Sequence, residues 1–170
     1  NLAEGSTLQS EEFAADCERC FGLCCTALSF QRSGSFGHDK PAGQACHFLE
    51  PTFRCGIHAQ REQLGYEGCE DFDCFGAGQI ASQEFAAQNW RREPAVARRL
   101  HARFAELLKV QEISAALHEA GNLGLTGSTE AERRRLLVAL RRGEGEKGDA
   151  DVTINAASRL IEEIGRLQLP

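Results

Sequence analysis

Apolar residues recur every three or four positions through much of the second half of the chain, a spacing that predicts amphipathic helices. The first such segment covers residues 80–92, and the second covers residues 95–120. Pro94 suits the first turn of the second helix, because backbone N–H groups in that turn have no partner within the helix and the N–H that proline lacks is not missed. Gly121 suits the end of the helix. The sequence therefore predicts two consecutive helices in this part of the chain.

A third helix and a shorter last one are predicted further on. Thr129 and Glu132 form a capping-box pattern that begins a helix ending at Arg142. The polar, glycine-containing stretch 143–150 reads as a flexible linker. The apolar spacing over about 155–168 then predicts a final helix.

The first part of the chain lacks this periodicity. Between residues 26 and 79 short mixed stretches are interrupted by glycine and proline, which favours loops with short helical turns. Each ordered loop residue costs about 1–2 kcal/mol of conformational entropy, so a metal or a set of disulfides is expected to hold these loops. We predict a mainly α fold, with a loop-rich, metal-organised N-terminal part packed on a helical C-terminal part. The expected divisions are a cysteine-rich metal-binding region, a helical region, a linker and a C-terminal helix: 13–78, 79–142, 143–150 and 151–170.

Composition and charge narrow the function classes. With 42% hydrophobic residues the chain can build a core, and a mean hydropathy of -0.36 predicts a soluble protein, which we expect in the cytoplasm and without a membrane partner. The net charge is -6 and the isoelectric point about 5.4. Nucleic-acid phosphates bind positively charged surfaces, and this chain is acidic, so we also expect no nucleic-acid partner.

All eight cysteines fall in the acidic first half. Residues 1–78 hold 5 basic and 12 acidic side chains. The cysteine spacing is C-x2-C-x3-C-C, then C-x8-C, then C-x4-C, and phenylalanines are interleaved among the thiols. A pair of cysteines separated by two residues can turn both sulfurs toward one ion. The predicted metal ligands are Cys17, Cys20, Cys24, Cys25, Cys46, Cys55, Cys69, Cys74 and His58.

The alternative to a metal site is a disulfide framework, as in a disulfide-stabilised secreted domain. Eight is an even number, but disulfide scaffolds are usually shorter and richer in cysteine. The neighbours Cys24 and Cys25 would each need a separate distant partner. Metal binding is therefore the leading interpretation, and the disulfide framework stays open as the alternative.

The choice between zinc and iron–sulfur also stays open. Two zinc ions on eight thiolates would leave a charge of about -4 in an already acidic region, which replacing some thiolates by His47 or His58 would relieve. The ferredoxin cysteine spacings are absent. Burial of the thiols among phenyl groups favours a cluster, since such surroundings limit solvent access. The expected cofactor is an iron–sulfur cluster or zinc.

Three short motifs resemble those of a known family. They are Cys-Phe-Gly-Leu-Cys-Cys at 20–25, Cys-Gly-Ile-His at 55–58 and Gly-Cys-Glu-Asp-Phe-Asp-Cys-Phe at 68–75. Through them the chain resembles, over about residues 17–92, the YkgJ-like zinc- or iron-chelating proteins, in particular the cysteine-rich domain that precedes pentapeptide repeats in actinobacterial proteins. The resemblance implies metal chelation by the eight cysteines. Some relatives of this broad family, the flagellin lysine methylases, use an iron–sulfur cluster.

Other features leave two function classes open. The protein is either a metal-dependent enzyme with an open coordination position, or a non-catalytic module with structural zinc whose arginine-bearing helices bind a protein partner. A catalytic Cys55–His58 pair is disfavoured, because a thiol among seven others is more often a ligand. His38, His101 and His118 have no cysteine nearby in the sequence and are expected to be ordinary surface or packing residues.

Overall fold

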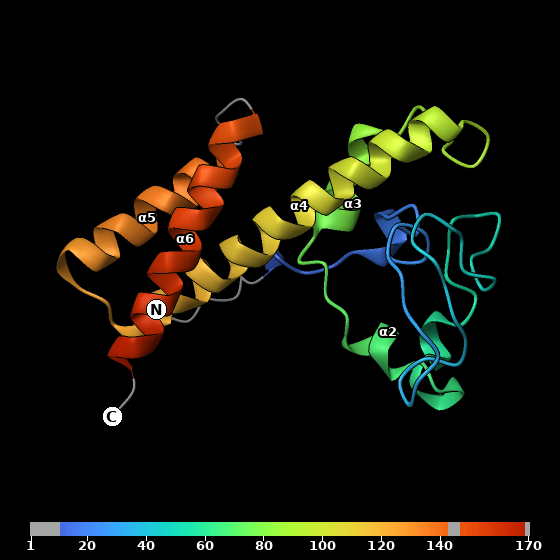
Figure 1. Cartoon of the computed structure of the whole chain (residues 1–170), viewed down its shortest axis with the longest axis horizontal. Coiled ribbons are helices and arrows are strands. Elements are labelled where there is room, and N and C mark those ends of the chain that lie inside the picture. The colour runs from blue at the N-terminus through green and yellow to red at the C-terminus, as the bar shows by residue number, and fades with distance from the viewer. Residues whose placement is uncertain (1–10, 143–146, 169–170) are drawn as a thin grey trace. The chain divides into compact units, whose positions relative to one another are not determined.

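The computed structural model describes residues 11–142 and 147–168, and within them the protein is mainly helical, as predicted (Figure 1). No helix in the described ranges is both long and apolar enough to cross a membrane. Short 3-10 turns precede the helices: η1 Cys17–Arg19, η2 His58–Gln60, η3 Glu62–Leu64 and, after α4, η4 Gly121–Leu123. The helices are α2 Glu67–Asp71, α3 Ala77–Glu84, α4 Pro94–Ala120, α5 Gly127–Arg142 and α6 Lys147–Leu167.

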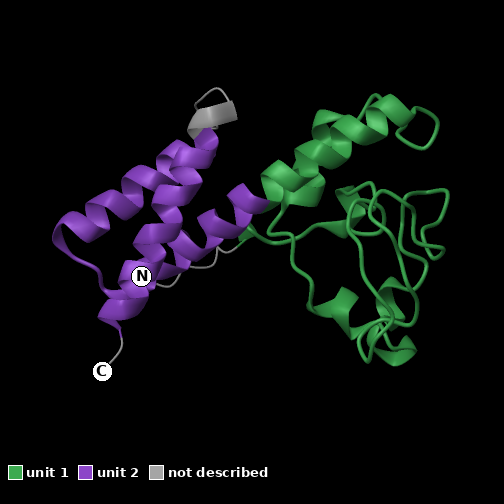
Figure 2. Ribbon diagram, in the orientation of Figure 1, with its two compact units in different colours: residues 1–108 green, residues 109–170 purple. Residues whose placement is uncertain are grey.

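The chain divides into two compact units, residues 1–108 and 109–170, and the boundary falls inside α4 (Figure 2). The sequence had suggested a division after residue 78. The boundary lies later because α3 and the first part of α4 contribute side chains to the core of unit 1, where Leu100 and Phe104 are almost fully buried. Helix and loop thus share one core within unit 1.

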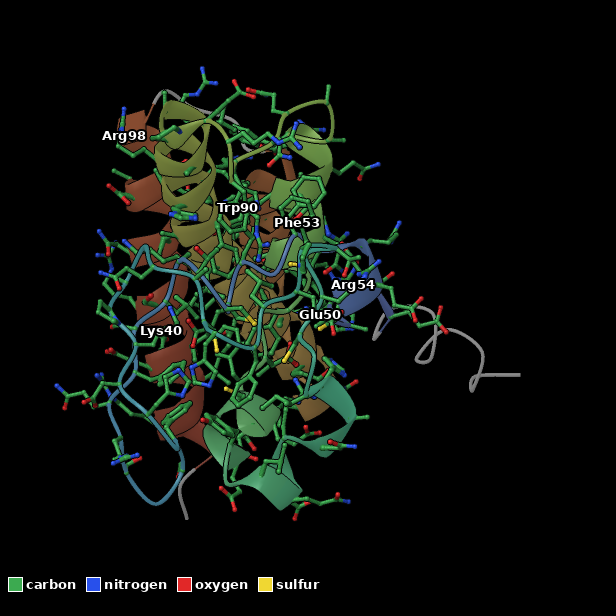
Figure 3. The ribbon with its side chains drawn as sticks, turned by 90° about the vertical axis from the view of Figure 1, so that its right-hand side faces the viewer. Lys40, Glu50, Phe53, Arg54, Trp90 and Arg98 are labelled. Carbon is green, nitrogen blue, oxygen red and sulfur yellow. The ribbon has the colours of Figure 1, made fainter. Side chains whose placement is uncertain are left out.

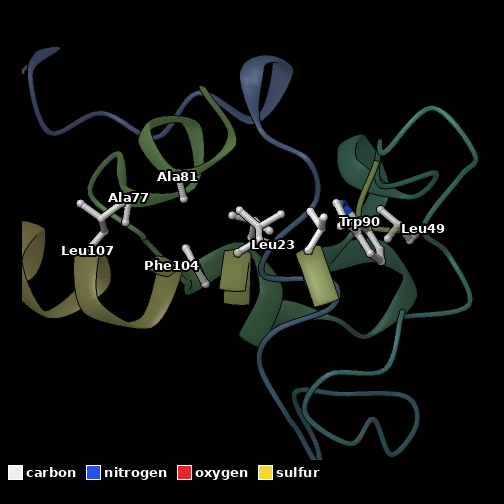
Figure 4. Close-up of a cluster of buried hydrophobic side chains, with 9 residues drawn as sticks. Leu23, Leu49, Ala77, Ala81, Trp90, Phe104 and Leu107 are labelled. Atoms are coloured by element: carbon white, nitrogen blue, oxygen red, sulfur yellow. The ribbon is translucent and has the colours of Figure 1, made fainter. Parts of the chain in front are cut away.

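The core of unit 1 joins the loops to the helices (Figure 4). Leu23 and Leu49 come from the loops, whereas Ala77 and Ala81 come from α3. Trp90, from the segment between α3 and α4, packs against Phe53 with ring centroids 5.6 Å apart. This apolar layer anchors the cysteine-bearing loops to α3 and α4, as expected for a small domain that must bury most of its apolar side chains.

The predicted helix 80–92 differs from the observed α3, which begins at Ala77 and ends at Glu84. Beyond it the chain makes successive turns, and the Asn89 side chain accepts a hydrogen bond from the Arg91 backbone N–H at 3.0 Å. Asparagine closes such turns readily and competes with helix. The turns allow Trp90 to reach the core.

The predicted helix 95–120 agrees with α4, while the third helix begins two residues earlier than the capping box indicated. The Glu132 carboxylate forms an ion pair with Arg135 at 2.6 Å inside α5 instead of capping its start. The predicted linker 143–150 lies partly outside the described residues, and its last four residues, 147–150, are already helical because α6 begins at Lys147.

The core of unit 2 is formed by the end of α4 together with α5 and α6. Leu117, Leu136, Ala157 and Ile164 are buried in it. Arg133, on α5, is 9% exposed and donates from Nη1 to the carbonyl oxygen of Leu117 at 3.0 Å. Its other nitrogens donate to the Glu130 carboxylate at 2.7 and 2.9 Å, so one guanidinium ties α5 to the end of α4.

We expect the change Arg133→Met to lower the free energy of unfolding by about 2 kcal/mol or more, because it leaves the Leu117 carbonyl and the Glu130 carboxylate without this partner. Arg135 is the matched control, since its pair with Glu132 is exposed. The change Arg135→Met should cost less than about 0.5 kcal/mol. Urea unfolding of the two variants measures the difference, and equal losses would show that burial of the Arg133 pair contributes nothing.

Candidate metal centre

Cysteine side chains gather around one cavity in unit 1, of about 690 Å³. Figure 3 shows sulfur atoms grouped in the middle of the loops, between the labelled Lys40 and Arg54. Much of the remaining wall is aromatic and aliphatic. Eight of the nine predicted ligands line this cavity: His58, Cys17, Cys20, Cys24, Cys25, Cys46, Cys55 and Cys69. The eighth cysteine, Cys74, lines a smaller cavity that Cys17, Cys20, Cys24 and Cys69 also border.

The first cysteines are positioned by hydrogen bonds to α3. Asp16 accepts at Oδ1 from the backbone N–H groups of Glu18 and Arg19, which caps the turn η1 that carries Cys17. The Gln79 side chain, on α3, accepts from the Asp16 backbone N–H at 3.1 Å and donates to the Ala14 carbonyl at 2.9 Å. The loop before Cys17 is therefore fixed to the helix.

Gly78 allows α3 to approach two of the thiols closely. A Cβ atom at this position would lie 2.8 Å from the Sγ of Cys20 and 3.6 Å from the Sγ of Cys74. The first distance is shorter than such contacts allow, so only glycine fits here without a shift. Ser82, one turn later, accepts from the Phe21 backbone N–H at 2.8 Å and donates to the Gly78 carbonyl at 2.7 Å. The loop bearing Cys20 is thereby held against α3.

The middle cysteines meet through contacts between loops. The backbone N–H of Cys46 donates to the carbonyl of Cys25 at 2.7 Å, which joins two segments 21 residues apart. An isolated antiparallel bridge pairs Leu49 with Cys55. The His58 backbone N–H donates to the Cys55 carbonyl at 3.2 Å, and the His58 side chain is exposed at the cavity wall.

Cys24 is the centre of the electrostatic interactions among the thiols. Its Sγ lies 4.0 Å from that of Cys25, and its charge acts on five other cysteines: Cys17, Cys20, Cys25, Cys46 and Cys69. The charge of Cys55 in turn acts on Cys24. All eight cysteines, which lie within the described ranges, are free thiols. The structure thus holds none of the bonds that the disulfide alternative requires.

Hydrogen bonding among three thiols separates their pKa values. A bond from the Cys25 thiol lowers the pKa of Cys55 to about 6 and also lowers the pKa of Cys24. The same bonds raise the pKa of Cys25, because the proton stays on its sulfur. At neutral pH Cys55 is accordingly favoured as the thiolate, the form of cysteine that binds metal, and the lowered pKa of Cys24 shifts that thiol in the same direction.

Burial raises the pKa of four other thiols. It raises the pKa of Cys20 and that of Cys69, each to about 11, and it raises the pKa of Cys17 and of Cys46. These thiols lose their protons readily only when a cation offsets the cost of a buried anion. A metal would supply that charge.

Two basic side chains lie among the thiols. The positive charge of Arg61 contributes to the lowered pKa of Cys24 and of Cys55, and it partly opposes the rise in the pKa of Cys17 and of Cys69. Its terminal nitrogens bind the Glu70 carboxylate at 2.7 Å and the Cys69 carbonyl at 3.3 Å, but its Nε–H is buried without a hydrogen-bond partner in the described structure. A buried donor beside several thiols suits an anionic group held by them.

Lys40 is the second cation, and it is only 3% exposed. Its ammonium interacts electrostatically with Cys46, Cys25, Cys24 and Cys69. No carboxylate of the described residues forms an ion pair with it, and its hydrogen bonds go to four carbonyl oxygens: Thr26, Leu28, Pro41 and Gln44. A buried ammonium is costly unless negative charge lies nearby, so thiolates in the cavity would stabilise it.

A separate group combines two histidines with one cysteine. One ligand atom from each of His38, Cys46 and His47 lies within 4.8 Å of the others, close enough to hold a metal ion. The sequence pointed to His47 through its position beside Cys46, but it indicated an ordinary surface or packing role for His38. No local signal links His38 to Cys46, because the contact depends on how the loops fold. His58, which the sequence favoured, is not in this group.

Comparison with known proteins adds one relative and no stated function. An uncharacterized protein of Bacillus subtilis (strain 168), YybG, is 34% identical over 132 residues, which are 77% of this chain and 47% of the relative. The chain therefore spans about half the length of this curated relative. No family model and no solved structure matches the chain.

Proposed function

We propose that unit 1 is a metal-binding module whose cysteine thiolates hold an iron–sulfur cluster in the 690 Å³ cavity. The observation that carries the proposal is that seven cysteines, from four separate stretches of the chain, line this one cavity. Thiols that are distant in sequence but line the same cavity are typical of the ligands of a metal centre. The resemblance to the YkgJ-like family, over about residues 17–92, supports the same proposal.

The spacing of the sulfurs favours a cluster over a single zinc ion. Zinc–sulfur bonds of about 2.3 Å place the sulfurs of a tetrahedral site roughly 3.8 Å apart. Among the described residues no three cysteine sulfurs lie within 4.8 Å of one another. Cysteines on a cluster can stand further apart, because they bind different iron atoms. Arg61 Nε–H and the Lys40 ammonium supply positive charge for an anionic cluster.

The size of the cavity favours an enzyme over a structural module. Its volume falls within the range of about 300–1,000 Å³ that is typical of small-molecule pockets, more than a single ion needs. Phe30, Phe48 and Phe72 form part of its wall. This space favours a metal-dependent enzyme with an apolar substrate over a purely structural module, and an iron–sulfur cluster supplies electron transfer or Lewis-acid chemistry when it is bound.

Two further parts of the proposal concern compartment and partners. Eight free thiols suit a reducing compartment, which favours the cytoplasm. A protein partner that binds through the arginine-bearing helices remains a prediction from the sequence.

Anaerobic purification followed by elemental analysis tests the proposal. We expect brown protein with iron and acid-labile sulfide in near-equal amounts, and visible absorption that bleaches with dithionite. Colourless protein carrying two equivalents of zinc would contradict it and favour the structural module. Four disulfides by mass spectrometry, with neither metal present, would contradict metal binding altogether.

A further inference from the structure

His38 and Cys46 are brought together by two tight loops. Phe30 and Lys40 pair through two backbone hydrogen bonds of 3.0 and 2.9 Å and close a loop that carries His38 near its end. The backbone N–H of Leu49 donates to the Cys46 carbonyl at 2.9 Å, so residues 46–49 form a turn. The sulfur of Cys46 lies 3.8 Å from Nε2 of His38.

His47 completes the group from the same turn. Its ring centroid lies 4.1 Å from that of His38, and one of its nitrogens is within 4.8 Å of both other ligand atoms. Metal bonds of about 2.0–2.1 Å to nitrogen and about 2.3 Å to sulfur place such atoms roughly 3.5 Å apart in a tetrahedral site. Small movements of the three side chains are therefore enough to surround one ion.

The orientation of His38 is fixed by its surroundings. Its Nδ1 lies 2.8 Å from the hydroxyl oxygen of Tyr66, which is buried. An ion on Nε2 requires the proton on Nδ1, which then donates to Tyr66, the arrangement by which a second hydrogen bond commonly orients a metal-binding histidine. Gly37 leaves room for it, because a Cβ there would lie 2.7 Å from the Tyr66 hydroxyl oxygen.

We propose that His38, Cys46 and His47 form a mononuclear site for a divalent transition-metal ion of the zinc class, distinct from the cysteine cluster. Among the described residues these are the one set of three such ligands whose atoms lie within 4.8 Å of one another. Two neutral imidazoles and one thiolate leave the bound ion with a net charge of about +1, and they leave its fourth position open. His47 is exposed, so that position is accessible to solvent or to a small anionic ligand.

The site does not depend on the proposed cluster, although the two share a wall. Cys46 lines the cysteine cavity as well, whereas neither His38 nor His47 does. Changes at the histidines therefore separate the two sites. His47 is the milder of the two positions to change, because its side chain is exposed and its loss opens no cavity.

The test compares zinc and iron in the same anaerobically prepared protein. Metal-depleted protein is reconstituted with iron and sulfide and then titrated with zinc. We expect one equivalent of zinc beyond the iron, and zinc K-edge absorption with two nitrogen ligands and one sulfur ligand. The change His47→Ala should weaken zinc binding at least about 100-fold, and Tyr66→Phe about 10- to 100-fold, while iron content and brown colour stay unchanged. His118→Ala, in unit 2, is the matched control and should bind zinc like the unchanged protein.

Three outcomes would overturn the proposal. His47→Ala could bind zinc with unchanged affinity, which would place the ion elsewhere. It could lose iron and colour together with zinc, which would make His47 a ligand of the cluster. The K-edge spectrum could show sulfur ligands only, which would assign the zinc to the cavity cysteines. Failure of the cluster itself would appear differently, as colourless protein that still loses one zinc on His47→Ala.

Discussion

Replacing Cys24 with serine should remove bound iron and bleach the protein. Cys24 is the thiol that interacts with most of the others, and its lowered pKa favours the thiolate. A serine hydroxyl stays protonated and is a harder ligand than the soft thiolate that iron–sulfur clusters require. We expect cluster affinity to fall at least about 100-fold, with Cys55→Ser giving a similar loss, as measured by iron content and visible absorption after anaerobic purification.

The same change should lower stability, since the free energy of metal binding contributes to folding wherever the apo site is loosely held. Ser29→Ala is the control, because Ser29 lines the same cavity without a thiol. That variant should keep its full iron content and its melting temperature. Cys24→Ser protein with unchanged colour and iron would show that Cys24 packs in the wall and binds no metal.

Lys40→Met should cost about 3 kcal/mol or more of unfolding free energy. The ammonium donates to four carbonyl oxygens between residues 26 and 44. Those of Thr26 and Pro41 also accept from backbone N–H groups, whereas those of Leu28 and Gln44 have no other donor in the described structure. Each acceptor left unpaired away from solvent costs about 1–3 kcal/mol. Methionine has a similar length but no donor. The variant should also bind iron more weakly, because it loses the buried positive charge that faces Cys24, Cys25, Cys46 and Cys69.

Lys109→Met provides the matched comparison, since Lys109 is exposed on α4. Its unfolding free energy should stay within about 0.5 kcal/mol of the unchanged protein. Thermal and urea unfolding, each measured with and without bound iron, separate the two contributions of Lys40. If Lys40→Met is as stable as Lys109→Met in the metal-free state, the four carbonyl groups do not depend on the ammonium.

The helices were largely predictable because their signals are local. The apolar repeat over 95–120, with Pro94 before it and Gly121 after it, predicts α4 to within one residue. The prediction of helix over 80–92 was too long, because the Asn89 turn and the burial of Trp90 outweigh the periodic pattern there. The helix α5 begins earlier than its capping-box pattern predicts. Glu132 forms an ion pair with Arg135 inside the helix and does not cap its start, as its spacing from Thr129 had suggested.

The sequence by itself determined that the N-terminal part is loop-rich, that its thiols lie among phenyl groups and that helices follow. These properties depend on composition and on spacing over a few residues. Only the tertiary structure decided which side chains meet: Cys46 with Cys25, the Nε–H of Arg61 among the thiols, and His38 with Cys46 and His47. Loops without a regular hydrogen-bond ladder have no period from which such meetings can be predicted. Their closure is set by long-range contacts, among them the core of Leu23 and Leu49 against α3 and α4 and the Lys40 ammonium on four carbonyls.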